Sequence, residues 1–61
     1  MTKYTIYVKD YSERNPTWKK AKTITGKIKA KTELKILREF ARDFYNNTGI
    51  IIKYKMEVKL K

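Results

Sequence analysis

Apolar residues recur with a helical period in one stretch of the chain, Thr32 to Asn46. At 100° per residue, its apolar side chains fall within about half of the circumference, and the charged side chains occupy the rest. The apolar half contains Leu34, Ile36, Leu37, Phe40, Ala41, Phe44 and Tyr45. Thr32 is suited to cap the first turn, and the stretch ending in Gly49 tolerates the left-handed conformation that ends many helices. We therefore predict an amphipathic helix over residues 32–46.

The stretches on either side alternate between apolar and polar residues, as in β-strands with one buried face. The alternation is clearest over Lys3–Lys9 and Ile50–Lys61. The apolar positions of these two predicted strands are Tyr4, Ile6, Val8, Ile52, Tyr54, Met56, Val58 and Leu60. After the first strand, Asp10 to Thr17 is rich in turn-forming residues and predicts a loop.

The segment from Trp18 to Lys31 predicts a second strand, long and irregular, with Ile24 on its buried side. Lys20 and Lys22 lie an even number of residues before Ile24 and therefore share its parity, which means that their side chains would point to the same face. Because lysines are not expected in the core, the first part of this strand is expected to extend beyond it. Gly26 interrupts the segment and indicates a bulge or bend. The alternative is a tight turn at this glycine, which would divide the segment into two short strands.

These elements predict one domain with an α+β fold of two layers, in the order β-β-α-β. Its three-stranded antiparallel sheet has the strand order 2-1-3, and one helix packs on one face. The helix is expected to bury Leu34, Leu37, Phe40 and Phe44. The sheet residues expected beneath them are Tyr4, Ile6, Val8, Ile24, Ile28, Ile52, Tyr54, Met56 and Val58. The other face of the sheet is expected to stay uncovered.

Charge is distributed unevenly along the 61 residues. Sixteen basic and six acidic side chains give a net charge of +10. Residues 1–31 carry nine basic and two acidic groups, and residues 48–61 carry four lysines and Glu57. Residues 32–47 carry three of each sign, so the predicted helix is neutral and the excess lies on the strands.

Strand parity places lysines, threonines and one central aromatic residue on the uncovered face. Lysine supplies charge for phosphates, threonine supplies hydroxyl groups, and Tyr7 is suited to stacking. We predict a nucleic-acid-binding site made of Tyr7, Lys9, Thr25, Lys27, Lys29, Lys53, Lys55 and Lys59. With few arginines, it should contact mainly the backbone, and DNA is expected in preference to RNA. The alternative is a solvated face whose lysines serve solubility. Trp18 is expected at the rim or edge of the core.

The stretch KIKAKTELKILREF, together with the three-strand and one-helix architecture, resembles the small DNA-binding domains of some integrases and plant transcription factors. In those domains the helix follows all three strands. Here a long strand follows the helix, which departs from their order.

Enzymatic chemistry, cofactors and metals are not expected, because the chain has no His or Cys and one Ser. We expect a cytoplasmic protein that does not bind membranes, since no export signal is visible and the predicted helix has a balanced polar face.

The first hypothesis is a nucleic-acid-binding module, such as a small regulator of a phage or mobile element. The second is an inhibitor or adaptor that docks an acidic protein or pairs through an edge strand. A homodimer through the C-terminal strand fits either.

Overall fold

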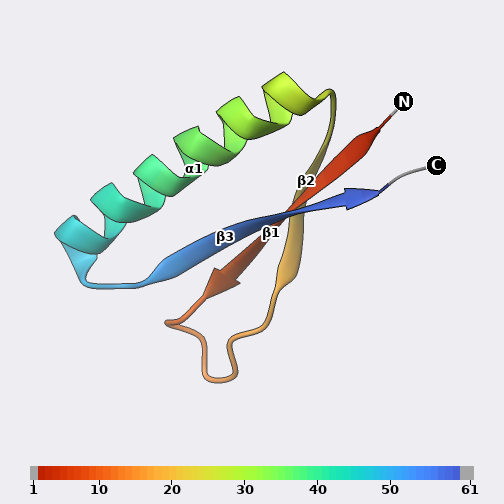
Figure 1. Ribbon diagram of the computed structural model, residues 1–61. Helices are drawn as coiled ribbons and strands as arrows, with labels where there is room; N and C mark the ends of the chain where they lie inside the picture. The colour runs from red at the N-terminus through yellow and green to blue at the C-terminus, as the bar shows by residue number, and fades with distance from the viewer. Residues whose placement is uncertain (1, 60–61) are drawn as a thin grey trace.

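A computed structural model describes residues 2–59 of the chain. Within them lie the strands β1 (Lys3–Asp10), β2 (Lys19–Thr25) and β3 (Ile52–Lys59), and the helix α1 (Lys27–Thr48) (Figure 1). The strands form one antiparallel sheet in the order β2-β1-β3. This confirms the predicted β-β-α-β fold and its strand order. The predicted inward position of Leu60 lies outside the described residues.

The helix α1 covers one face of the sheet and lies closest to β3 (Figure 1). The residues that face the sheet recur at helical spacing and are Ala30, Leu34, Leu37, Ala41 and Phe44. Ala30 and Ala41 are buried, and their small side chains let the helix approach the strands. Beneath them Ile6, at the centre of β1, is completely buried. The result is a thin molecule of two layers, with Cα extents of 38 × 23 × 10 Å.

The helix begins five residues earlier than predicted, and the predicted strand over residues 26–31 is wrong. Gly26 ends the strand with a φ of 106°, a conformation that other residues rarely adopt, and its carbonyl accepts the first helical hydrogen bond from Ala30 N–H (3.0 Å). Thr32 is not the cap. It lies inside α1, where its hydroxyl donates to the carbonyl of Ile28 (2.9 Å). The sequence located the interruption at Gly26 but not the change from strand to helix.

The end of α1 follows the prediction. Gly49 adopts a left-handed conformation with a φ of 77°, and its N–H donates to the carbonyl of Tyr45 (2.7 Å). The Thr48 hydroxyl donates to the Phe44 carbonyl (2.7 Å) and accepts the N–H of Ile50 (3.1 Å). These bonds satisfy the last turn of the helix and direct the chain back along β3.

Three residues predicted to lie in the core are exposed, and one of them is Val58 of β3, which is 51% exposed. Ile28, expected on the inner face of β2, belongs to the first turns of α1 and is 82% exposed. Phe40 is 60% exposed, because it lies to the side of the line that runs from Ala30 to Phe44. The core of this small domain is therefore narrower than the apolar face of its helix.

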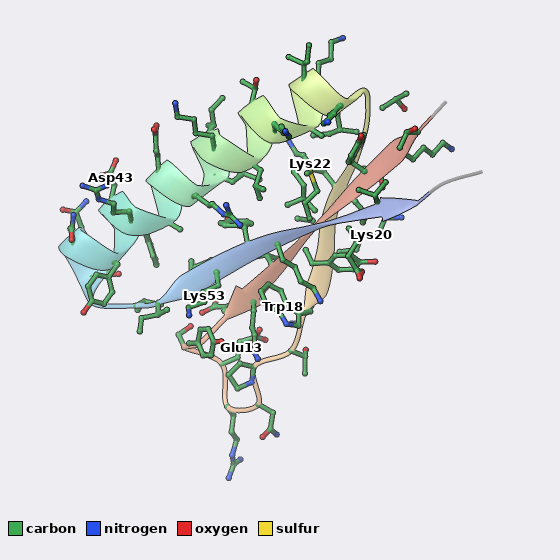
Figure 2. All side chains as sticks on the ribbon, viewed as in Figure 1. Glu13, Trp18, Lys20, Lys22, Asp43 and Lys53 are labelled. Carbon is green, nitrogen blue, oxygen red and sulfur yellow. The ribbon has the colours of Figure 1, made fainter. Side chains whose placement is uncertain are left out.

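A β-bulge in β2 decides which lysines face the helix. Ile6 of β1 lies opposite Lys22, but the next residue, Tyr7, lies opposite Lys20, so Ala21 is an extra residue in β2. The bulge reverses the side-chain parity of the strand, and Lys20 therefore shares the face of Tyr7, contrary to the prediction. Lys22, labelled in Figure 2, keeps the predicted orientation. Its ammonium group pairs with Glu33 of α1 at 2.7 Å.

Candidate nucleic-acid interface

The sheet face opposite α1 is formed by alternate residues of the three strands. In the register of β1 and β3, Tyr7 lies opposite Lys55, and Lys9 lies opposite Lys53. Directly opposed residues of an antiparallel pair project to the same face, so these four side chains lie together. They are four of the eight residues predicted to form the site.

Aromatic rings and lysine ammonium groups alternate across this face. The Lys55 Nζ lies 5.4 Å from the ring centre of Tyr7 and 4.8 Å from that of Trp18. The Lys9 Nζ lies 5.7 Å from the ring centre of Trp18 and 5.2 Å from that of Tyr11. The Lys53 Nζ lies 6.0 Å from the ring centre of Tyr11. We call these six residues, in the order Tyr7, Lys55, Trp18, Lys9, Tyr11 and Lys53, the aromatic–lysine row.

The lysines of the row are held by ring faces and not by carboxylates. Each cation–π contact at an exposed site is worth about 0.5–1 kcal/mol. Both ion pairs in the described part of the chain involve other lysines, Lys19 with Glu13 and Lys22 with Glu33. Tyr11 and Trp18 are 41% and 36% exposed, so both rings remain accessible to a ligand.

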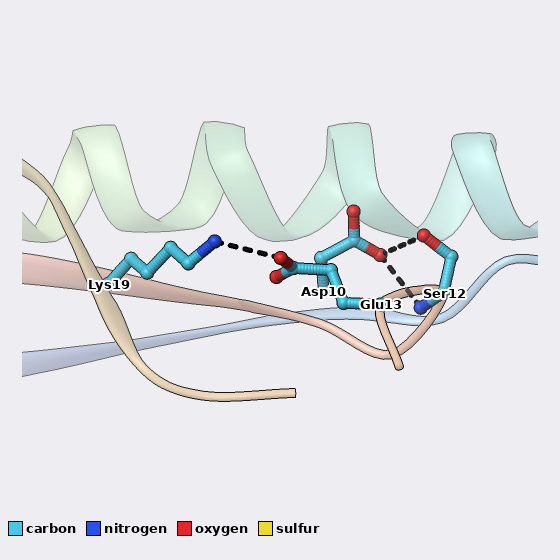
Figure 3. A network of polar contacts seen from close by, with 4 residues as sticks. All are labelled: Asp10, Ser12, Glu13 and Lys19. Atoms are coloured by element: carbon cyan, nitrogen blue, oxygen red, sulfur yellow. Dashed lines mark hydrogen bonds and ion pairs between the residues drawn. The ribbon is translucent and has the colours of Figure 1, made fainter. Parts of the chain in front are cut away.

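The loop between β1 and β2 carries Tyr11 and ends at Trp18, and polar contacts brace it (Figure 3). The backbone N–H of Tyr11 donates to the carbonyl of Ile51 (3.0 Å), which anchors the start of the loop beside β3. Asp10 Oδ1 accepts the backbone N–H and the hydroxyl of Ser12, at 2.8 and 2.6 Å. Lys19 and Glu13 join the two sides of the loop with a 2.8 Å ion pair.

Asp10 and Lys19 of this brace are charged near neutral pH. The hydroxyl and N–H of Ser12 lower the pKa of Asp10 below its usual value of 3.8, because both donate to the ionised carboxylate. The hydrogen bond from Lys19 to Glu13 raises the pKa of Lys19 above its usual value of 10.5. The loop that presents Tyr11 and Trp18 therefore keeps the same bonds across the neutral range.

The other four predicted site residues lie away from the row. Thr25 ends β2 opposite Lys3, at the end of the sheet far from the loop. Lys27 and Lys29 belong to α1, so their predicted place on the sheet face is wrong. Lys59 ends β3, and its side chain lies outside the part of the chain that the structure describes.

Sequence reasoning missed Tyr11 and Lys20, and it placed Trp18 only at the rim of the core. Tyr11 has the parity of Lys9, so continuing the alternation of β1 by two residues would have included it. The position of Trp18 depends on the bulge at Ala21, which sets the parity of the preceding residues of β2. Figure 2 shows Trp18 and Lys53 near the end of the sheet that carries the loop.

Comparison with known proteins found no matching family model, no similar curated protein and no similar solved structure. Over residues 2–59, no three potential metal-ligating side chains cluster together. The described helix is also too polar to cross a membrane. Only the geometry of the described residues therefore supports the candidate interface.

Proposed function

We propose that this protein is a non-enzymatic nucleic-acid-binding module that holds single-stranded DNA on the open face of its sheet. The observation that carries the proposal is the aromatic–lysine row, in which two exposed rings and the half-buried Tyr7 alternate with three lysines that form no ion pair within the described residues. Positive charge that follows a backbone, with rings on which bases stack, is the combination used to bind single strands.

The exposed rings favour unpaired bases over a duplex. Bases in a duplex are already stacked on one another, whereas an unpaired base can place its face against Tyr7, Tyr11 or Trp18. Stacking of one base on an aromatic side chain is worth about 1–3 kcal/mol. This exceeds the roughly 0.5–1 kcal/mol of an exposed cation–π contact, so a base can displace a lysine from its ring. The displaced ammonium group then contacts the neighbouring phosphate.

Modest sequence preference follows from this mode of binding. Stacking accepts any base, and lysine neutralises phosphates as a point charge without the forked geometry of arginine. We place this activity in the cytoplasm, as for a small regulator of a phage or mobile element, because the chain contains no Cys and suits a reducing compartment.

Trp18 is the only tryptophan and lies within the row, so its fluorescence reports directly on the site. Titration with an oligothymidine should quench this fluorescence. If the three lysines of the row each neutralise one phosphate, affinity should fall about 20-fold between roughly 50 and 200 mM salt. An oligouridine and a DNA duplex, titrated in parallel, measure the preference for DNA and for single strands.

A matched pair of variants separates the row from general attraction by a basic protein. Lys55→Ala should weaken oligothymidine binding about tenfold, since Lys55 lies between Tyr7 and Trp18. Lys35→Ala removes the same charge from the exposed side of α1 and should change affinity less than twofold. Equal losses in both variants, or unchanged Trp18 fluorescence at low salt, would overturn the proposal. Tighter binding of a polyglutamate peptide than of oligothymidine would favour an acidic protein as the partner.

A further inference from the structure

Part of the apolar surface of α1 has no partner among residues 2–59, which the structure describes. Ile36 and Phe40, one turn apart, are 54% and 60% exposed. The ring of Phe40 stacks on that of Phe44, with centroids 6.4 Å apart and planes 15° apart. We call Ile36, Phe40 and the half-buried Phe44, whose inner side faces the sheet, the helix stripe. The stripe lies on the opposite flank of the helix from Arg38 and Arg42, which line hollows along β3.

The helix stripe is uncovered because of where the sheet lies. The helix packs closest to β3, so the C-terminal half of α1 has a strand along only one flank (Figure 1). On the other flank, β2 runs away from this half of the helix toward the loop. Among the described residues, the strands therefore leave Ile36 and Phe40 uncovered.

The exposed area matches what a dimer would bury. The chain exposes 4977 Å², whereas a folded monomer of 7.3 kDa exposes about 4,200 Å². The excess of about 800 Å² equals the area that each partner loses in an interface of standard size. The radius of gyration, 12.5 Å, also exceeds the value of about 10.5 Å expected for 61 residues.

Charge indicates that the partner is a second copy of this chain. Two molecules that each carry +10 repel one another unless their contact surfaces are neutral. The stripe itself carries no charged side chain. The edge strand β3 instead carries Lys53, Lys55 and Lys59 against Glu57. Pairing two β3 strands would bring like charges together. A membrane surface would favour a basic flank, which the stripe lacks.

We propose that the protein is a symmetric homodimer in which the helix stripes of two copies pack against each other. A two-fold axis near Phe40 would place each Phe40 against its counterpart and each Ile36 near the other copy's Phe44, with the helices antiparallel. This arrangement differs from a dimer through the C-terminal strand. It leaves the open faces of both sheets free and does not depend on nucleic-acid binding.

Analytical ultracentrifugation of the whole chain in the absence of nucleic acid tests the dimer. Between about 10 and 100 μM, the wild-type mass should be close to twice 7.3 kDa. Phe40→Glu should raise the dimer dissociation constant at least 30-fold, since an exposed aromatic at the centre of an interface is a typical hot spot. Ile28→Glu, an equal change at the most exposed apolar residue of α1, should leave the dimer intact. A monomeric wild-type protein at 100 μM would overturn the proposal.

A measurement on the wild-type protein covers the case in which Phe40→Glu does not fold. In a mixture of ¹³C-labelled and unlabelled protein, isotope-filtered NMR should detect contacts between copies at Ile36 and Phe40. Contacts between copies at Val58 or Tyr54 of β3, with none at Phe40, would place the interface on the strand edge and overturn the proposal.

Discussion

The two faces of the sheet both carry lysines, but their partners differ. On the face that meets α1, Lys22 pairs with Glu33, and at the edge of this layer Lys19 pairs with Glu13. On the open face, Lys9, Lys53 and Lys55 lie over aromatic rings. Ion pairs with carboxylates fix Lys19 to the loop and Lys22 to the helix. The aromatic rings orient Lys9, Lys53 and Lys55 without neutralising their charge. The two faces therefore differ in how many lysines are left without a carboxylate partner among the described residues, and we propose the open face as the one that binds a polyanion.

The largest expected effect is the loss of stability when the covered face is truncated. Ile6→Ala removes the completely buried side chain at the centre of β1 and should lower the free energy of unfolding by about 2–5 kcal/mol. A domain of this size has a total stability of about 3–9 kcal/mol, so most of the margin would be lost. Urea unfolding followed by circular dichroism measures the change.

Tyr7 is next to Ile6 in β1 but lies on the open face, so a substitution of Tyr7 is the matched control for Ile6→Ala. Tyr7→Leu keeps an apolar side chain in the strand but removes a stacking surface. It should retain the fold and weaken oligothymidine binding about tenfold. If Tyr7→Leu unfolds the protein and Ile6→Ala does not, the distinction between the two faces is wrong.

A smaller effect should follow from removing one carboxylate from each face. Glu57 lies opposite Thr5 on the open face, and Glu33 pairs with Lys22 beside the helix. Glu57→Gln should strengthen oligothymidine binding about twofold, since it removes repulsion of phosphates near the row. Glu33→Gln makes the same change of charge and should leave affinity unchanged. Fluorescence anisotropy of a labelled oligonucleotide, at equal salt, measures both. Equal gains would show that only the total charge matters.

The smallest expected effect concerns the loop that presents Tyr11 and Trp18. Hydrogen bonds from Ser12 hold the pKa of Asp10 below 3.8 in the folded protein. The stabilisation is therefore present above pH 3.8 and is lost as the pH falls through the lowered pKa. NMR titration should show Asp10 protonating below pH 3.8 while the amide signal of Ser12 shifts with it. Ser12→Ala should move the pKa of Asp10 upward, and an unchanged pKa in this variant would contradict the assigned brace.

The alternation of apolar and polar residues was sufficient to predict the fold. It identified β1 and β3 and their inner faces, and with them the common face of Tyr7, Lys9, Lys53 and Lys55. Parity is reliable there because β1 and β3 pair without a bulge over eight residues, so each pair of opposed side chains shares a face.

The same reasoning failed over KIKAK, residues 27–31. Five residues that alternate are compatible with a strand, but lysine and alanine are also good helix formers, and so short a segment does not distinguish the two periods. Packing decides for the helix, because Ala30 continues the line of Leu34, Leu37 and Ala41 against the sheet. As a consequence, Lys27 and Lys29 leave the sheet face.

By itself the sequence determined the order of the elements, the antiparallel sheet and the lysine-bearing side of its two longest strands, since these depend on local periodicity. Only the tertiary structure decided that α1 begins at Lys27, that Ala21 shifts the parity of β2, and that Trp18 joins the lysines. It also decided that Phe40 remains exposed. Each of these depends on how segments far apart in the chain pack against one another, and the residues nearby in sequence leave that choice open.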